Sequence, residues 1–241
     1  TFDASDVTVS DGSSITIAAD ALAALAVGDY QFTVALASGA EYVYTNVTIA
    51  TRAIGTWEEF NLMRTDAVLQ GETNYYKLEG YYVLTGNILP ADEEDYLLLE
   101  DGDKGHFNSF VSKQTQYTQI SENGYGFTGV FDGRGYTVDS VHFANVRRNT
   151  IFGDIAGGTI KNVAFTNMSA EQASANAAYF ALTFISVGGH FENVVLHYNY
   201  GSNNPAGGIA YAMDGTNTFT NVVIYGNNTS TADNAGLLSG Q

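Results

Sequence analysis

The 241-residue chain contains no cysteine and only two prolines. The absence of cysteine excludes disulfide bonds and thiolate chemistry. Basic residues are also scarce, with 9 Lys and Arg against 26 Asp and Glu, and the formal net charge is −17. Nucleic acids and anionic lipids bind through clustered basic residues, so we expect neither as a partner. No apolar run approaches the roughly 18 residues that span a bilayer, so we expect no membrane insertion.

Glycine and apolar residues are abundant. The chain has 26 glycines, and 45% of its residues are hydrophobic, which is sufficient for a core. Many Gly, Asn, Thr and Ser residues with little Pro are typical of short strands joined by sharp turns. The composition therefore predicts an all-β protein and disfavours a helical bundle.

A six-residue pattern occurs four times in the second half of the chain: apolar, polar, Ser or Asn, Val, variable, apolar. Its third positions are Ser140, Asn162, Asn193 and Asn221. The steps between them are 22, 31 and 28 residues. Steps of this length are typical of a solenoid, in which each repeat is one supersecondary unit.

The chemistry of one copy indicates which solenoid to expect. Strict alternation around Asn162 would leave Val163 and Phe165 outside the core. A bend at Asn162 corrects this, because Asn tolerates the left-handed conformation. Ile160, Val163 and Phe165 then point inward, and Lys161 points outward. Short strands that meet at an Asn corner predict a parallel β-helix, with the four third positions stacked as one corner row.

The run Phe-Thr-Gly-Val-Phe-Asp-Gly-Arg-Gly-Tyr-Thr-Val at 127–138 resembles the GLUG-type repeats of bacterial surface proteins. The resemblance extends over residues 52–241 and implies a right-handed β-helix that is exposed on the cell surface or secreted. Asp-Gly is also a strong signal for a tight turn. Asp132, Gly133 and Gly135 are therefore predicted to form a structural turn at a corner of the coil. A likeness of this kind supports fold and location but does not indicate the ligand.

Residues 1–51 contain alternating strands of another kind, with a helical turn at 19–25 that is expected to end at Gly28. The phrase Leu-Ala-Val-Gly-Asp-Tyr at 25–30 resembles the second half of the Ig-like modules of bacterial wall-associated proteins. The segment is too short for a complete sandwich of about 100 residues. Either preceding strands of a partial Ig-like β-sandwich are absent from this chain, or these strands pack on the neighbouring domain. The first alternative is preferred, and we expect further domains of the same protein on both sides.

Thr56 and Glu59 have the spacing of a capping box. They predict a helix at about 56–66 that caps the N-terminal end of the β-helix core. The first strong β-helix strand is expected at 81–88. A long acidic insertion follows at about 89–125, and binding residues tend to lie in such loops.

The insertion holds two sets of candidate ligand-binding residues. Four carboxylates are a weak candidate Ca²⁺ site, because Ca²⁺ takes roughly six to eight oxygen ligands. They are Asp92, Glu94, Asp101 and Asp103. The EF-hand pattern fails in this segment, so a solvated acidic loop is preferred and no cofactor is expected. Three aromatic residues are candidate platforms for sugar stacking. They are Tyr96, Tyr117 and Tyr125.

These observations predict a non-enzymatic, adhesin-like binding or display module of a bacterial extracellular protein. Carbohydrate and a host or cell-surface protein are the candidate partners. One alternative is a β-helix polysaccharide lyase or glycoside hydrolase, for which Asp132, Asp139 and Asp154 are the coil acids to consider. A purely structural stalk with the same fold is the other alternative.

Overall fold

The computed structural model describes residues 2–10, 14–35, 38–62, 79–90, 126–143, 148–170, 179–200, 206–229, 235–236 and 238–239. The chain divides into two compact units, Thr1–Thr51 and Arg52–Gln241. Most of the predicted insertion, residues 91–125, lies outside the described residues.

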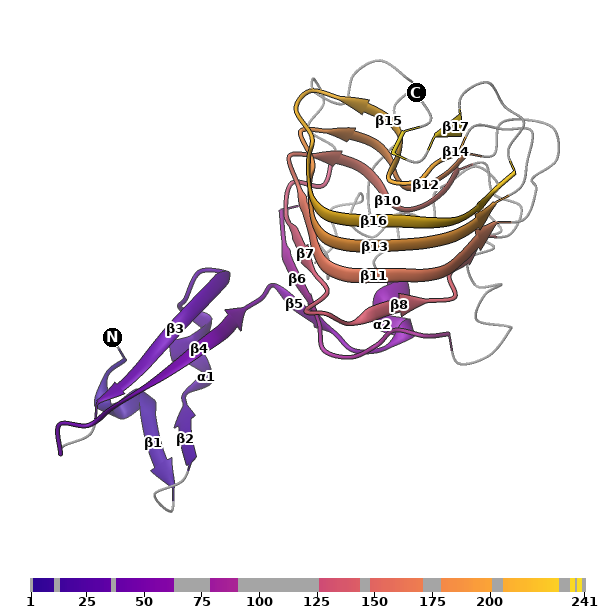
Figure 1. The fold of residues 1–241 in the computed structure, drawn as a ribbon. Coiled ribbons are helices and arrows are strands. Elements are labelled where there is room, and N and C mark those ends of the chain that lie inside the picture. Colours follow the sequence, from indigo (N-terminus) through magenta and orange to yellow (C-terminus); the bar gives the residue numbers. More distant parts are fainter. Residues whose placement is uncertain are drawn as a thin grey trace. The chain divides into compact units, whose positions relative to one another are not determined.

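The first unit consists of two antiparallel hairpins (Figure 1). The strands are β1 (Val7–Ser10) with β2 (Ser14–Ile17), and β3 (Gly28–Ala35) with β4 (Glu41–Ile49). A short 3-10 helix, η1 (Ala4–Asp6), precedes β1, and α1 (Ala19–Ala23) connects the two hairpins. The antiparallel strands support the predicted β-module in part, as two separate two-stranded sheets.

The first unit differs from the predicted structure at Gly28, and its described side chains form no buried core. Gly28 does not end the helical turn, because α1 stops at Ala23 and Gly28 begins β3 with a φ of 149°. None of the side chains whose exposure is described in this unit is buried. Phe32 contacts the rings of Phe2 and Tyr30, with centroids 5.5 and 6.2 Å away. The hairpins of this unit therefore contribute a small apolar cluster rather than a closed core.

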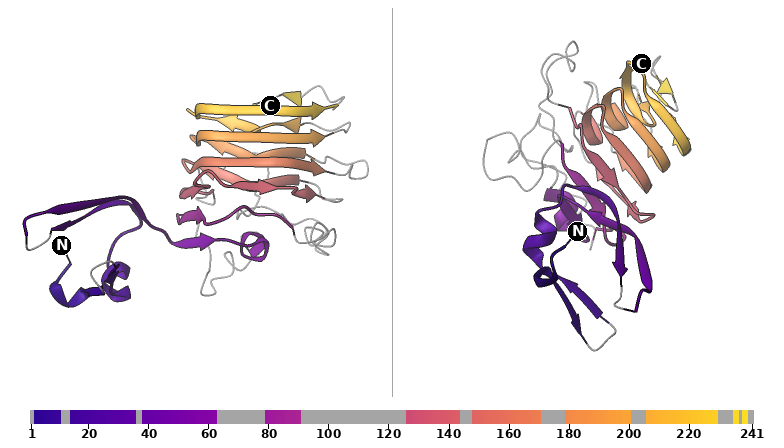
Figure 2. Two further views of the ribbon diagram at one scale, coloured as in Figure 1. Left: turned by 60° about the horizontal axis from the view of Figure 1, so that its bottom comes forward. Right: turned by 90° about the vertical axis from the view of Figure 1, so that its left-hand side faces the viewer.

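The second unit is a β-solenoid of about three turns, which confirms the predicted β-helix at this level. Its first sheet contains eight strands. They are β5 (Arg52–Ile54), β6 (Tyr81–Leu84), β7 (Val130–Asp132), β8 (Thr137–Asp139), β9 (His142–Phe143), β11 (Thr159–Ala170), β13 (His190–Tyr200) and β16 (Thr218–Asn228). All their pairings are parallel, and Figure 2 shows β11, β13 and β16 as successive coils.

The second sheet has five strands, also paired in parallel. They are β10 (Arg148–Ala156), β12 (Tyr179–Val187), β14 (Ala206–Gly207), β15 (Ala210–Asp214) and β17 (Ala235–Gly236). In the first sheet, β11 extends to Ala170 and β13 to Tyr200.

The register of the first sheet gives the length of one coil. Phe131, Ile160, Phe191 and Phe219 are register partners, which lie 29, 31 and 28 residues apart. The parallel sheet begins earlier than predicted, because β5 pairs with β6 and places Arg52 opposite Tyr82. A strand of three residues carries too little alternation to be recognised from sequence.

The register also corrects the predicted corner row. Asp139 pairs with Thr166, so Ser140 lies beside Asn167 and not in the row of Asn162. The prediction was wrong for Ser140 because residues 165–170 of β11 also follow the repeated pattern, with Met168 in place of the Val, and the first copy aligns with them. In the coil before β11, the position of the Asn162 corner is taken by the turn that follows Asp132.

The core is continuous from the N-terminal helix through the coils. Glu59 N–H donates to Thr56 Oγ1 at 3.2 Å, and Glu59 Oε2 accepts from Thr56 N–H at 3.2 Å. This reciprocal capping box starts α2 (Trp57–Leu62), and the predicted residues 63–66 lie outside the described residues. Trp57 and Phe60 are buried, and the Phe60 ring lies 6.4 Å from that of Phe131. The helix therefore contributes its apolar face to the solenoid core.

Candidate functional site

The corners of the first sheet are formed by three Asn residues in the left-handed conformation. Their φ values are 52° for Asn162, 52° for Asn193 and 51° for Asn221. One residue in this conformation reverses the inward and outward alternation of the strand. Ile160 and Val163, on either side of the Asn162 corner, are accordingly both buried. Each corner also turns its amide toward the neighbouring coil.

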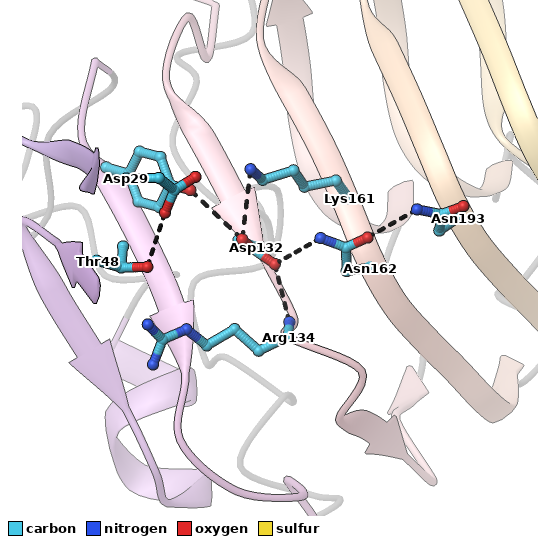
Figure 3. Close-up of polar contacts among 8 residues, drawn as sticks. Asp29, Thr48, Asp132, Arg134, Lys161, Asn162 and Asn193 are labelled. Carbon is cyan, nitrogen blue, oxygen red and sulfur yellow. Dashed lines mark hydrogen bonds and ion pairs between the residues drawn. The ribbon is translucent and has the colours of Figure 1, made fainter. Parts of the chain in front are cut away.

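The three amides form a continuous hydrogen-bonded row. Asn221 Nδ2 donates to Asn193 Oδ1 at 2.9 Å. Asn193 Nδ2 donates to Asn162 Oδ1 at 2.8 Å (Figure 3). Asn162 Nδ2 donates to Asp132 Oδ1 at 3.1 Å. The row therefore ends on a carboxylate, and Asp132 takes the place in this row that the sequence had assigned to Ser140.

Asp132 also organises the turn that was predicted from the Asp-Gly signal. Its Oδ1 accepts from Arg134 N–H at 2.9 Å, and Tyr136 N–H donates to Gly133 O at 2.8 Å. Arg134 and Gly135 have φ values of 53° and 85°, the signs of a type I′ turn. The sequence signal and the conformation therefore agree at this corner.

The second carboxylate oxygen of Asp132 faces a cation and a phenol. Lys161 Nζ lies 3.4 Å from Asp132 Oδ2, and Tyr81 O–H donates to the same oxygen at 3.4 Å. Lys161 Nζ also lies 5.4 Å from the centroid of the Tyr81 ring. The Asp132 side chain is 8% exposed, so these partners compensate a largely desolvated charge.

A second corner row, which the sequence reading missed, surrounds Asp139. Ser140 and Asn167 have φ values of 58° and 53°. Asp139 accepts hydrogen bonds from the Thr166 hydroxyl, from Asn167 Nδ2 at 2.8 Å and from Ser140 Oγ at 2.9 Å. Burial raises the pKa of Asp139, but these hydrogen bonds outweigh it and hold the pKa below its ordinary value. The signal that could have found this row is the incomplete copy of the repeat at 165–170, in which Met168 replaces the Val.

Aromatic and amide pairs continue this row over the next two coils. His197 Nδ1 accepts from Asn167 N–H at 3.3 Å, and its ring stacks on that of Tyr225 with centroids 4.6 Å apart and planes at 9°. Asn227 Nδ2 donates to Asn199 Oδ1 at 3.1 Å. The stacked pair is therefore bordered by hydrogen-bonded amides.

These side chains belong to what we call the outer face, the surface of β13 and β16 that faces away from the core. It comprises His190, Glu192, Asn193, Val195, His197 and Asn199 of β13, and Thr218, Thr220, Asn221, Val223, Tyr225 and Asn227 of β16. All of them are exposed or half-buried. The register therefore sets the exposed side chains of β16 beside those of β13 along both strands.

The three acids named as coil acids occupy separate environments. Asp132 and Asp139 belong to the first sheet, where each accepts several hydrogen bonds. Asp154 lies in β10 of the second sheet and is 3% exposed. Its backbone carbonyl accepts from Phe127 N–H at 2.8 Å. The structure therefore assigns these acids to different parts of the coil.

The candidate residues of the insertion lie outside the described residues. They are Asp92, Glu94, Asp101, Asp103, Tyr96, Tyr117 and Tyr125. Within the described ranges, no group of three or more His, Asp or Glu side chains is placed to hold a metal ion. In the same ranges, no helix has the length and apolar character needed to cross a membrane.

Comparison of the chain with models of known families, with curated proteins and with solved structures found no match.

Proposed function

We propose that this chain is a non-enzymatic binding or display module of a bacterial extracellular or cell-surface protein. In this proposal a GLUG-type right-handed β-helix follows part of an Ig-like module. The observation that carries the proposal is the outer face, where β13 and β16 align side chain over side chain for the length of both strands. Solenoids commonly use such extended, repetitive surfaces for binding.

The chemistry of the outer face favours an uncharged glycan as the ligand. The His197–Tyr225 stack lies between two pairs of linked amides, Asn193 with Asn221 and Asn199 with Asn227. Amides exchange hydrogen bonds with sugar hydroxyls, and aromatic rings bind the apolar face of a sugar. The formal charge of −17 disfavours acidic glycans. A host or cell-surface protein is the second class of partner that such a face fits.

The surroundings of the coil acids support a non-enzymatic role. A glycosidase needs two carboxyl groups about 5 to 9.5 Å apart that are free to act on one substrate. Asp132 is held by Lys161 and by the turn, and Asp139 by three side-chain hydrogen bonds. These contacts use the carboxylate oxygens to join neighbouring coils. We therefore assign both acids to the stability of the stack.

A glycan array followed by titration calorimetry tests the proposal. We expect specific hits, and we expect Tyr225→Ala to weaken the best hit by about tenfold, since it removes the exposed half of the stack. Tyr42→Ala is the matched control, because Tyr42 is similarly exposed but belongs to the first unit. Its affinity should equal that of the wild type.

The other results separate the alternatives. Loss of binding in Tyr96→Ala, Tyr117→Ala or Tyr125→Ala, with Tyr225→Ala unaffected, would move the site to the insertion. Turnover of a polysaccharide that disappears in both Asp132→Asn and Asp154→Asn would establish the enzyme instead. If the protein binds neither glycans nor surface proteins, the result would favour the alternative of a purely structural stalk.

A further inference from the structure

The hydrogen bond to His197 fixes the position of its ring proton. The donor is the backbone N–H of Asn167, which cannot accept, so Nδ1 carries the lone pair and Nε2 carries the proton of the neutral ring. In the described part of the chain, Nε2 makes no hydrogen bond, yet it is not one of the buried polar atoms without a partner. His197 therefore presents an N–H donor to solvent on the outer face.

Both neighbouring strands hold the His197 ring in this orientation. Asn167 of β11 has a φ of 53°, and its side-chain amide donates to Asp139 Oδ1 at 2.8 Å. The backbone N–H that faces His197 is therefore fixed in direction. From β16, the Tyr225 ring stacks on the imidazole with planes at 9°. A donor that is ordered before the ligand arrives loses little entropy on binding.

The other polar side chains of the outer face have no such fixed polarity. Asn, Thr and Tyr side chains both donate and accept, and Glu192 only accepts. His190 is the informative comparison, because its Nδ1 atom lies 2.7 Å from the Thr218 hydroxyl, which permits either tautomer. Within the outer face, His197 is therefore the side chain whose exposed edge the structure fixes as a donor.

Exposed methyl groups lie beside this donor. Val195 and Val223 are register partners, and they precede His197 and Tyr225 by two residues on the same face of their strands. Val223 is 53% exposed. A donor next to exposed methyl groups is complementary to a ligand group that combines an acceptor oxygen with a methyl group.

We propose that the outer face binds a glycan that contains N-acetylated amino sugars, with His197 as the specificity-determining residue. The acetamido carbonyl oxygen accepts from His197 Nε2–H, and the acetamido methyl group packs on Val195 and Val223. A hydroxyl group at the same position of the sugar lacks the methyl group, so it cannot make both contacts. This inference rests on the proposed glycan-binding function and specifies the class of ligand.

Calorimetric titration with matched sugars tests the inference. Chitotetraose and cellotetraose have the same linkage and differ in the acetamido group, and so do N-acetylgalactosamine and galactose. We expect the acetylated member of the preferred pair to bind about tenfold more tightly. His197→Phe keeps a ring against Tyr225 but removes the donor, and should reduce the ratio of the two affinities to about one. His197→Gln should restore the preference, because its amide can accept from Asn167 N–H and donate to the ligand.

Tyr136→Ala is the control for these variants. Tyr136 is an exposed aromatic residue of the same unit and lies outside the outer face, so its removal should leave the ratio of affinities unchanged. Equal affinities within both pairs would overturn the inference, as would a preference that His197→Phe leaves intact. The proposed function would survive either result if other glycans on the array bind. If no glycan binds, both the inference and the proposed function fail.

Nitrogen-15 spectra of the unmodified protein test the donor without any substitution. At mildly alkaline pH, where imidazole is neutral, His197 should carry its proton on Nε2. The Nε2–H signal should shift when the acetylated sugar is added and stay in place with its hydroxyl analogue. A proton on Nδ1, or a signal that neither sugar moves, would contradict the assigned role of His197.

Discussion

Asn193 Nδ2 lies 2.8 Å from Asn162 Oδ1, although 31 residues separate the two in the chain. Both residues have the same left-handed φ of 52°. One residue type therefore performs two tasks in each coil, because it bends the strand and links the bend to the neighbouring coil.

Asn193→Val should destabilise the solenoid strongly. A β-branched side chain is disfavoured in the left-handed region, at a cost of about 1 to 3 kcal/mol. The substitution also removes the hydrogen bonds to Asn162 and Asn221, each worth about 1 kcal/mol. Urea denaturation should show the sum as a lower free energy of unfolding.

Two further variants serve as controls for this prediction. Asn193→Gly should cost less than Asn193→Val, because Gly adopts the same dihedral angles without strain. Glu192→Ala, at an exposed neighbouring position, should change the free energy of unfolding by no more than about 0.5 kcal/mol. A harmless Asn193→Val would contradict the role assigned to the corner, as would a Glu192→Ala variant less stable than Asn193→Gly.

Asp132→Ala should lower the free energy of unfolding by about 1 to 3 kcal/mol, because it removes the contacts that the buried carboxylate makes. They are the hydrogen bonds from Arg134 N–H, Asn162 Nδ2 and Tyr81 O–H and the ion pair with Lys161 Nζ. Asp132→Asn keeps one carbonyl oxygen as an acceptor, so it should lower the free energy of unfolding by less than Asp132→Ala does. Equal losses in the two variants, measured by urea denaturation, would argue against the carboxylate as the end of the amide row.

The contribution of Asp139 to stability should depend on pH. The folded state lowers the pKa of Asp139 from its ordinary value of 3.8, so the ionised carboxylate favours folding. This contribution is complete above the unfolded-state pKa and is lost as the pH falls through the folded-state pKa. The difference in unfolding free energy between the wild type and Asp139→Asn should therefore be largest near pH 5 and shrink below pH 3.8. A difference in unfolding free energy that is constant with pH would show that the charge of the Asp139 carboxylate does not stabilise the folded state.

Gly133→Ala should destabilise the turn after Asp132 by steric overlap. A Cβ atom at this position would lie 2.4 Å from Val163 Cβ and 2.6 Å from Asn162 O. We expect a loss of about 1 to 3 kcal/mol in the free energy of unfolding. Gly135→Asn is the control, since a Cβ at Gly135 meets no atom within 4 Å and Asn tolerates its positive φ. If both variants were equally stable, the close approach of the coils at Gly133 would be refuted.

Calcium should leave the melting temperature unchanged. This expectation rests on the sequence of the acidic segment, which lacks the ligand pattern of an EF-hand. Differential scanning calorimetry in millimolar CaCl₂ and in EDTA measures it directly. A rise of several degrees with Ca²⁺ would indicate a bound ion. Asp101→Asn and Asp103→Asn would then show whether these carboxylates provide the ligands.

The sequence by itself determined the class of fold and the local geometry of the corners. The repeated pattern, with steps of 22, 31 and 28 residues, predicted a solenoid with parallel strands, and the structure has both. Asn162, Asn193 and Asn221 were identified because left-handed conformation is a preference of the residue itself. The turn at Asp132 and the capping box at Thr56 are equally local, since each depends on groups only a few residues apart.

Only the tertiary structure decided which corner stacks on which. Ser140 matches the repeat as well as Asn162 does, yet it pairs beside Asn167. β11 contains two corners, and the pattern fits the second at every position except Met168. Asp132 joins the amide row only after a coil of about 30 residues has returned the chain to the same sheet. Register between coils depends on pairing across such distances and on the length of each connecting turn. A local pattern carries no information about either, which is why the residues of the row could be predicted but not its first member or its direction.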